Sequence, residues 1–130
     1  MSEHLGYFPD VMPTLAQIAG VEAPKNDGLS IVPALTGKGT QKTHEYLYWE
    51  MGGQVAVRMG HYKAVRAGKN RPFELYDLAE DIEEQNNLAS AKPEVLARMM
   101  AHAKDAHTQN IKGAYLPGAK ALGFQGHLSD

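Results

Sequence analysis

Apolar residues recur every three to four positions near the N-terminus, in the segment FPDVMPTLAQIAG. This spacing predicts a short helix whose apolar face carries Val11, Leu15 and Ile18. Asp10 directly precedes the apolar run and is expected to cap the helix, while Gly20 ends it. A second helix of barely two turns is predicted in SIVPALTG, where a serine stands at the cap position, a proline follows early and a glycine ends the segment.

The pattern changes between residues 45 and 78, where β-branched and aromatic residues alternate with polar ones. Four strands are predicted, in EYLYWEM, QVAVRM, YKAVRA and FELYDL. Because short glycine-containing turns separate them, the strands are expected to form an antiparallel meander. Alternation places Leu47, Trp49 and Met51 on one face of the first strand, and Val55, Val57 and Met59 on one face of the second.

A last periodic segment, KPEVLARMMAHAKDAH, predicts an amphipathic helix that covers one face of this sheet. Its apolar face carries Leu96, Met99, Met100, Ala103 and His107. The fold class is therefore α+β: a four-stranded antiparallel meander sheet covered by a C-terminal amphipathic helix, with two short N-terminal helices. We expect the domain to span residues 10–107, with 1–9 as a preceding linker segment and 108–130 as an irregular tail.

Composition limits the partners of this domain. A chain of 130 residues with 43% apolar content is long enough for one domain with a real core. Its 13 basic and 15 acidic residues give a net charge of −2, so nucleic acid and membrane are not expected partners. No apolar run approaches the ~18 residues that cross a bilayer, and MSEHLGYFPD lacks the features of a signal peptide.

A dense acidic stretch, DLAEDIEE, raises the question of a metal site. A hard cation needs several oxygens at about 2.3 to 2.6 Å, but the stretch lacks the D-x-[DN]-x-[DN]-G loop. It favours a capping box in which Asp81 accepts a hydrogen bond from the N–H of Glu84 and the Glu84 side chain reaches back. Asn87 is expected to end that turn in a left-handed conformation, so that Leu88 folds onto the core. We interpret the acidic stretch as architecture.

Familiar catalytic patterns are missing from the sequence. The chain has no cysteine, which removes thiolate nucleophiles and sulfur-ligated metals. Its six histidines include no pair at i and i+4, and no serine lies in G-x-S-x-G. We therefore predict neither a catalytic residue nor a metal ligand in this chain.

Basic residues gather on the central strands and the turn that follows them. Such charges on exposed strands discourage edge-to-edge pairing, but they can also form an anion-binding rim. Arg58, His61 and Lys63 lie around one predicted hairpin turn, and they are the candidates for a substrate rim.

Five segments, read in order, resemble the C-terminal region of sulfatases, the sulfuric ester hydrolases related to alkaline phosphatase. They are DVMPTLAQIAG, DGLSIVPALTG, AVRMGHYK, ELYDLAEDIEEQNNLA and KPEVLARM. Each is weak alone, but five in the same order with similar gaps identify the family over about residues 10–107. One departure is Ile82, which stands where the family's D-P-x-E turn commonly has proline, and it bears on the rigidity of that turn.

The resemblance implies an arylsulfatase-like parent enzyme that uses calcium and a formylglycine residue. Formylglycine arises from the cysteine or serine of a C/S-x-P-x-R motif, and this motif is absent here. The lysine and histidine partners of the family belong to a larger N-terminal domain, so no catalytic residue can be carried over. We expect an inactive domain that supports an N-terminal catalytic domain and lines the entrance for a sulfated small molecule or glycan.

The alternative is a free-standing, non-enzymatic binding or interaction module with the same fold. If the first helix packs on a domain outside this chain, the isolated chain is expected to expose apolar surface and to self-associate.

Overall fold

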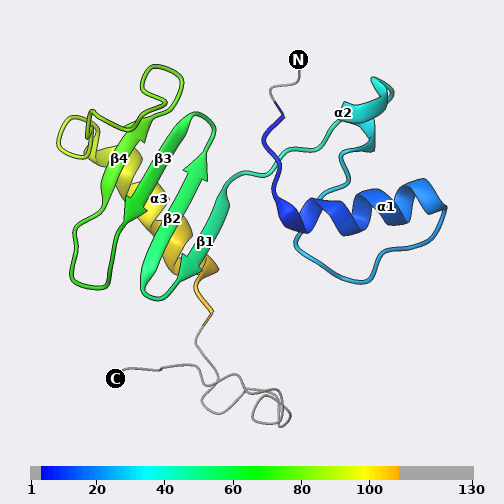
Figure 1. Ribbon diagram of the computed structural model, residues 1–130, viewed down its shortest axis with the longest axis horizontal. Helices are drawn as coiled ribbons and strands as arrows, with labels where there is room; N and C mark the ends of the chain where they lie inside the picture. Colours follow the sequence, from blue (N-terminus) through cyan, green and yellow to red (C-terminus); the bar gives the residue numbers. More distant parts are fainter. Residues whose placement is uncertain (1–3, 109–130) are drawn as a thin grey trace, which may run out of the picture.

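The computed structural model describes residues 4–108, which form an N-terminal lobe of short helices beside a sheet with one covering helix (Figure 1). The N-terminal lobe, residues 4–46, holds the 3-10 helix η1 (Phe8–Asp10) and the helices α1 (Val11–Ala19) and α2 (Val32–Thr36). The sheet unit holds β1 (Leu47–Met51), β2 (Gln54–Met59), β3 (Tyr62–Arg66), β4 (Glu74–Asp77) and α3 (Pro93–Ala106). The predicted α+β fold is confirmed. The predicted tail lies outside the described residues, except for Thr108.

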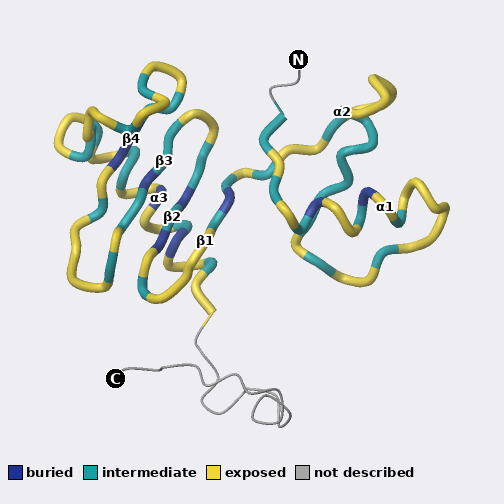
Figure 2. Tube along the Cα trace, viewed as in Figure 1, coloured by how far each residue is buried: buried dark blue, intermediate teal, exposed yellow. Residues whose placement is uncertain are grey.

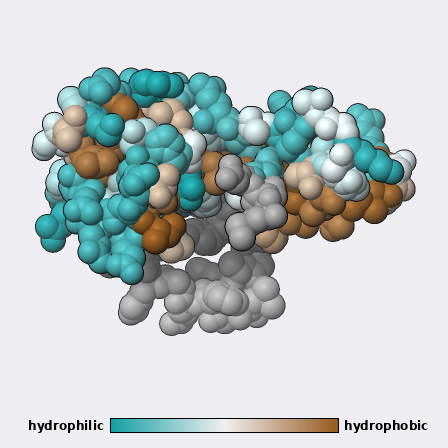
Figure 3. All heavy atoms as spheres, turned by 90° about the horizontal axis from the view of Figure 1, so that it is seen from above, coloured by the Kyte–Doolittle hydropathy of each residue, from teal (hydrophilic) through white to brown (hydrophobic). Residues whose placement is uncertain are grey.

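Helix α1 is confirmed over the predicted residues, and Gly20 ends it with a φ of 70°. Its buried residue is polar, however, and its apolar residues are on the surface. The hydroxyl of Thr14 donates to the Asp10 carbonyl oxygen at 2.6 Å and accepts from the Ile31 amide at 3.0 Å. Exposed positions predominate along α1 in Figure 2, and Figure 3 shows hydrophobic surface along the same lobe.

The four strands form one sheet in the order β1-β2-β3-β4, each antiparallel to its neighbour. The predicted meander is confirmed. Gly52 and Gly53 in the first hairpin turn have φ values of 59° and 84°, which glycine adopts without steric cost. No helix within residues 4–108 is long and apolar enough to span a membrane.

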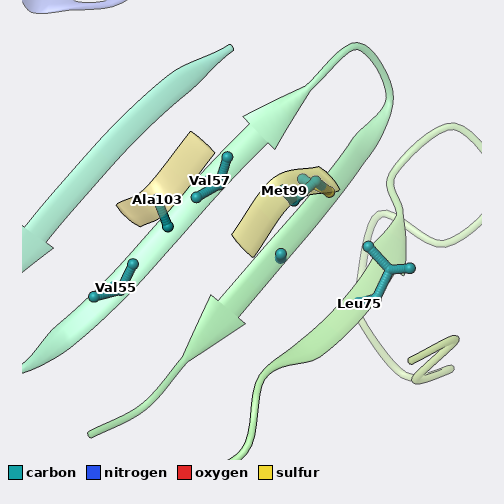
Figure 4. Close-up of a cluster of buried hydrophobic side chains, with 6 residues drawn as sticks. Val55, Val57, Leu75, Met99 and Ala103 are labelled. Carbon is teal, nitrogen blue, oxygen red and sulfur yellow. The ribbon is translucent and has the colours of Figure 1, made fainter. Parts of the chain in front are cut away.

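Helix α3 covers one face of the sheet and closes the hydrophobic core (Figure 4). The strand register aligns Val57 with Ala64 and Ala64 with Leu75, which forms a row across three strands. These three residues and Met99 of α3 have no measurable exposure to solvent. The rest of the buried cluster is Val55 and Ala103.

The register also decides which face of β1 points toward α3. Tyr48 pairs with Val57 and packs against the core, so Trp49 lies on the face of the sheet opposite α3. The predicted apolar face of α3 was wrong at two positions. Met100 is exposed, and His107 lies past the end of the helix, where its Nδ1 is 2.7 Å from a carboxylate oxygen of β1.

The acidic stretch forms turns rather than the predicted capping box. Asp81 accepts from the amides of Gln85, at 3.0 Å, and Asn86, at 2.7 Å, so its carboxylate has the expected architectural role with different donors. The left-handed residue is Glu84, with a φ of 57°, rather than Asn87. Asn87 Oδ1 instead accepts from the Leu75 and Ala89 amides, which ties the turn to β4.

Candidate functional site

The β2–β3 hairpin brings the three predicted rim residues together. Arg58 and Lys63 are directly paired across the two strands, and His61 lies in the turn that joins them. Because their neighbours Val57 and Ala64 point toward α3, Arg58 and Lys63 point to the opposite face of the sheet. The sequence therefore predicted the proximity of these three side chains correctly, while their role as a rim stays a prediction.

Their side-chain partners differ. Lys63 forms a salt bridge with Glu84, and His61 Nε2 lies 3.6 Å from a carboxylate oxygen of Asp77. Arg58 donates from Nε to the Gly60 carbonyl oxygen at 3.2 Å, and within residues 4–108 no carboxylate lies within salt-bridge distance of it. The remaining N–H groups of the guanidinium can bind an anion in a bidentate manner.

An apolar groove lies further along the same face, and Arg58 is not among its lining residues. Trp49 pairs with Ala56, and Ala56 precedes Arg58 by two residues, so the three side chains share one face of the sheet. The groove has a volume of about 570 Å³, and its lining includes Trp49, Met51, Ala56 and Val65. An aromatic ring and a cation are thus placed on the same face of the sheet, opposite α3.

A second polar centre lies where the N-terminal lobe meets the sheet. Asp10 is only 2% exposed, and its Oδ2 accepts from the Tyr7 amide at 3.0 Å. Its Oδ1 accepts from the Leu29 amide at 2.7 Å and is 2.8 Å from His44 Nε2. Burial raises the pKa of the Asp10 carboxyl, but the hydrogen bonds from Leu29, Tyr7 and His44 outweigh it and hold that pKa below its ordinary value. The predicted capping role of Asp10 was wrong, because no α1 amide donates to its side chain.

Aromatic contacts and a tight backbone approach surround this carboxylate. The Tyr7 ring lies edge-on to the His44 ring, with centroids 4.9 Å apart, and to the Trp49 ring at 6.3 Å. A Cβ at Gly28 would lie 2.0 Å from the Pro9 carbonyl oxygen, so only glycine fits there. Sequence reasoning missed this centre, since the carboxylate and the imidazole are 34 positions apart and match no spacing motif.

Within residues 4–108, no group of three or more His, Cys, Asp or Glu side chains is placed to hold a metal ion. The carboxylates of Asp10 and Asp81 are already hydrogen-bonded to protein groups. Asp10 bonds two amides and an imidazole, and Asp81 bonds two amides. A calcium ion needs six to eight oxygen ligands that converge on one point. The described residues therefore do not fit a calcium ion.

The family model described as N-sulphoglucosamine sulphohydrolase, C-terminal, matches residues 4–110. An uncharacterized sulfatase of Schizosaccharomyces pombe is 33% identical over 107 residues, which cover 72% of this chain and 19% of that protein. The Delta 4,5-hexuronate-2-O-sulfatase of Bacteroides thetaiotaomicron is 33% identical over 89 residues, covering 62% of this chain and 18% of that protein.

Solved structures agree with these sequence matches. A structure described as a 2-O GAG sulfatase superposes with a TM-score of 0.62 at 32% identity, covering 74% of this chain and 23% of the other. A further relative, the ulvan-active sulfatase of Formosa agariphila, is 32% identical over a region that covers 68% of this chain and 26% of that protein. The chain thus spans about one fifth to one quarter of the length of these relatives.

Proposed function

This chain belongs to the sulfatase family, whose C-terminal domain it matches, and we propose from this premise that it is the non-catalytic domain of a larger sulfuric ester hydrolase. The observation that carries the proposal is the extent of the match. The family's C-terminal model covers residues 4–110, whereas the chain corresponds to only about a fifth of its first two curated relatives. The catalytic part of such an enzyme lies in the other four fifths.

On this proposal the reactive groups come from an N-terminal catalytic domain. A sulfate-transfer site needs a nucleophile, a cation and positioned donors at one place. This chain has no cysteine and no C/S-x-P-x-R motif, and its described residues do not fit calcium. The formylglycine nucleophile and the calcium ion that the family resemblance implies are therefore assigned to that catalytic domain.

The contribution of this chain to substrate binding is the sheet face opposite α3. Arg58 supplies a guanidinium without a carboxylate partner in the described part of the chain, and Trp49 supplies a flat apolar ring on the same face. A sulfated sugar carries both an anion and an apolar ring face. Two relatives are named for activity on sulfated sugars, the hexuronate-2-O-sulfatase and the ulvan-active sulfatase, and we assign the same substrate class to the parent enzyme.

Lys63 and His61 have a supporting role in this arrangement. Lys63 is paired with Glu84 in the acidic stretch, and His61 is paired with Asp77 at the end of β4. Both side chains therefore fix neighbouring segments in place, whereas Arg58 faces the ligand. Substrate capture should therefore depend more on Arg58 than on Lys63.

Steady-state kinetics of the full-length enzyme test this surface. Arg58→Ala should raise KM for the sulfated substrate about tenfold, equivalent to ~1.4 kcal/mol, and leave the melting temperature unchanged. Arg98→Ala is the matched control, because Arg98 is an exposed arginine on α3, on the covered side of the sheet. An unchanged KM together with a lowered melting temperature for Arg58→Ala would assign Arg58 a purely structural role.

Reading the coding sequence upstream of Met1 would distinguish this function from that of a free-standing binding module. A C-x-P-x-R segment in the same reading frame supports the sulfatase domain, and a natural start at Met1 without that segment favours the module. Sulfate release by the pure 130-residue chain in the presence of calcium would overturn the non-catalytic role.

A further inference from the structure

Helix α1 presents apolar side chains to solvent along most of its length. The α1 face consists of Phe8, Val11, Met12, Leu15, Ile18 and Val21. Each of these is at least 47% exposed, and Phe8 reaches 86%. An exposed apolar area of this kind is uncommon on a monomeric domain and is typical of a surface that another protein part covers.

The interior of the N-terminal lobe cannot absorb these side chains as it stands. The buried residues of the lobe are Asp10 and Thr14, and both are polar and hydrogen-bonded. Because Thr14 bonds the Ile31 amide, the inner side of α1 is fixed toward the segment that enters α2. The apolar side of α1 therefore stays on the outside while the lobe is folded.

The shape of the α1 face fits a docked partner. Five of its residues, with Pro9, Ala16 and Ala19, line an open groove of about 760 Å³. Helix α1 itself has no charged residue, and the charged residue that lines the groove is Asp27, so the groove does not attract an anionic substrate or nucleic acid. Its complement is an apolar surface of another folded part.

We propose that the α1 face packs against the N-terminal catalytic domain of the sulfatase, an inference that rests on the function proposed above. The family match includes α1, so this helix belongs to the unit that defines the C-terminal domain rather than to an added segment. In the relatives that share this unit, about four fifths of the length lies outside it. That remainder supplies the partner for the α1 face. The occupant is thus in the same polypeptide.

Cysteine labelling can locate this contact, because the chain has no cysteine of its own. Ile18→Cys places a thiol on the α1 face, and Ile82→Cys places the control thiol in the acidic turn, where the native side chain is 74% exposed. In the isolated chain both variants should react with N-ethylmaleimide at similar rates. In the full-length enzyme the Ile18→Cys site should react on the order of 100-fold more slowly, with the control unchanged and peptide mass spectrometry assigning each label.

A second pair of variants measures the same contact by stability. Ile18→Glu should leave the melting temperature of the isolated chain unchanged and lower that of the full-length enzyme by several degrees, whereas Ile82→Glu should change neither.

The outcomes separate the docking surface from the proposed function. Fast labelling of the Ile18→Cys site in a full-length enzyme that cleaves sulfate esters overturns the docking surface and leaves the function standing. A reading frame without a catalytic domain overturns both. If labelling of the isolated chain slows with rising protein concentration while the full-length enzyme is labelled fast, a second copy covers the α1 face and the proposal is wrong.

Discussion

Asp10 Oδ1 and His44 Nε2 lie 2.8 Å apart, although the two residues are separated by 34 positions in the sequence. The bond joins the start of α1 to the segment that leads into β1, so it ties together the two ends of the N-terminal lobe. Both side chains are largely buried, which excludes water as a competing partner.

Removal of the Asp10 carboxylate should therefore destabilise the protein. Asp10→Ala leaves the Tyr7 and Leu29 amides without their acceptor and should lower the free energy of unfolding by about 2 to 3 kcal/mol. Urea denaturation followed by circular dichroism measures the change. Asp105→Ala, at an exposed site on α3, is the control and should stay within ~0.5 kcal/mol of wild type.

Low pH should destabilise the protein by protonating the same carboxylate. The pKa of Asp10 in the folded protein is below its ordinary value of 3.8, so the unfolded chain takes up this proton first as pH falls. The stabilisation is present above about pH 4 and is lost as pH falls through the folded pKa. Asp10→Asn should show a shallower decline of stability over that window, and a decline as steep as that of wild type would contradict this role.

Asp10 and His44 should also be energetically coupled. A double-mutant cycle with Asp10→Asn and His44→Gln should give a coupling free energy of about 1 kcal/mol, because each change removes the same 2.8 Å contact. Strict additivity of the two single changes would mean that the contact contributes nothing to stability.

Tyr48 should titrate at unusually high pH. Burial, followed by the hydrogen bond from its hydroxyl to Glu50, raises the pKa of Tyr48 to about 12. The neutral phenol therefore stabilises the fold fully below pH 10, and this contribution is lost as pH rises from 10 through about 12. Absorbance at alkaline pH should show a late-titrating tyrosine that disappears in Tyr48→Phe.

Two adjacent methionines on α3 should respond differently to truncation. Met99 has no exposed surface in the core, whereas Met100 is 44% exposed. Met99→Ala should cost about 2 to 5 kcal/mol through lost burial and the cavity left behind, while Met100→Ala should cost well under 1 kcal/mol. Equal effects in thermal denaturation would contradict the orientation of α3.

The helices, strands and first hairpin turn were predictable because each depends on near neighbours in the sequence. Alternation fixed the strands, and the glycine pair at positions 52 and 53 fixed the first hairpin turn. The capping box failed because Glu84 bonds Lys63 instead, a tertiary contact between residues 21 positions apart. Local pattern rules carry no information about such a competitor.

The candidate site was predictable only in part, for the same physical reason. Arg58, His61 and Lys63 follow one another through a tight turn, so sequence placed them together. The absence of a carboxylate near Arg58 in the described residues, and the placement of Trp49 on the same face, depend on contacts between segments distant in the sequence. The Asp10 centre depends on packing between distant segments within the lobe.

The polar interior of the N-terminal lobe also governs how the protein responds to temperature. The heat capacity change of unfolding comes chiefly from newly hydrated apolar surface, and the lobe buries hydrogen-bonded Asp10 and Thr14 where the sheet buries valine, leucine and methionine. Local opening of the lobe should thus carry a smaller heat capacity change than opening of β2 and β3, which amide hydrogen exchange at several temperatures can measure. Cold should weaken the sheet and its helix more than the lobe, so the two halves of one short chain have different optimal temperatures.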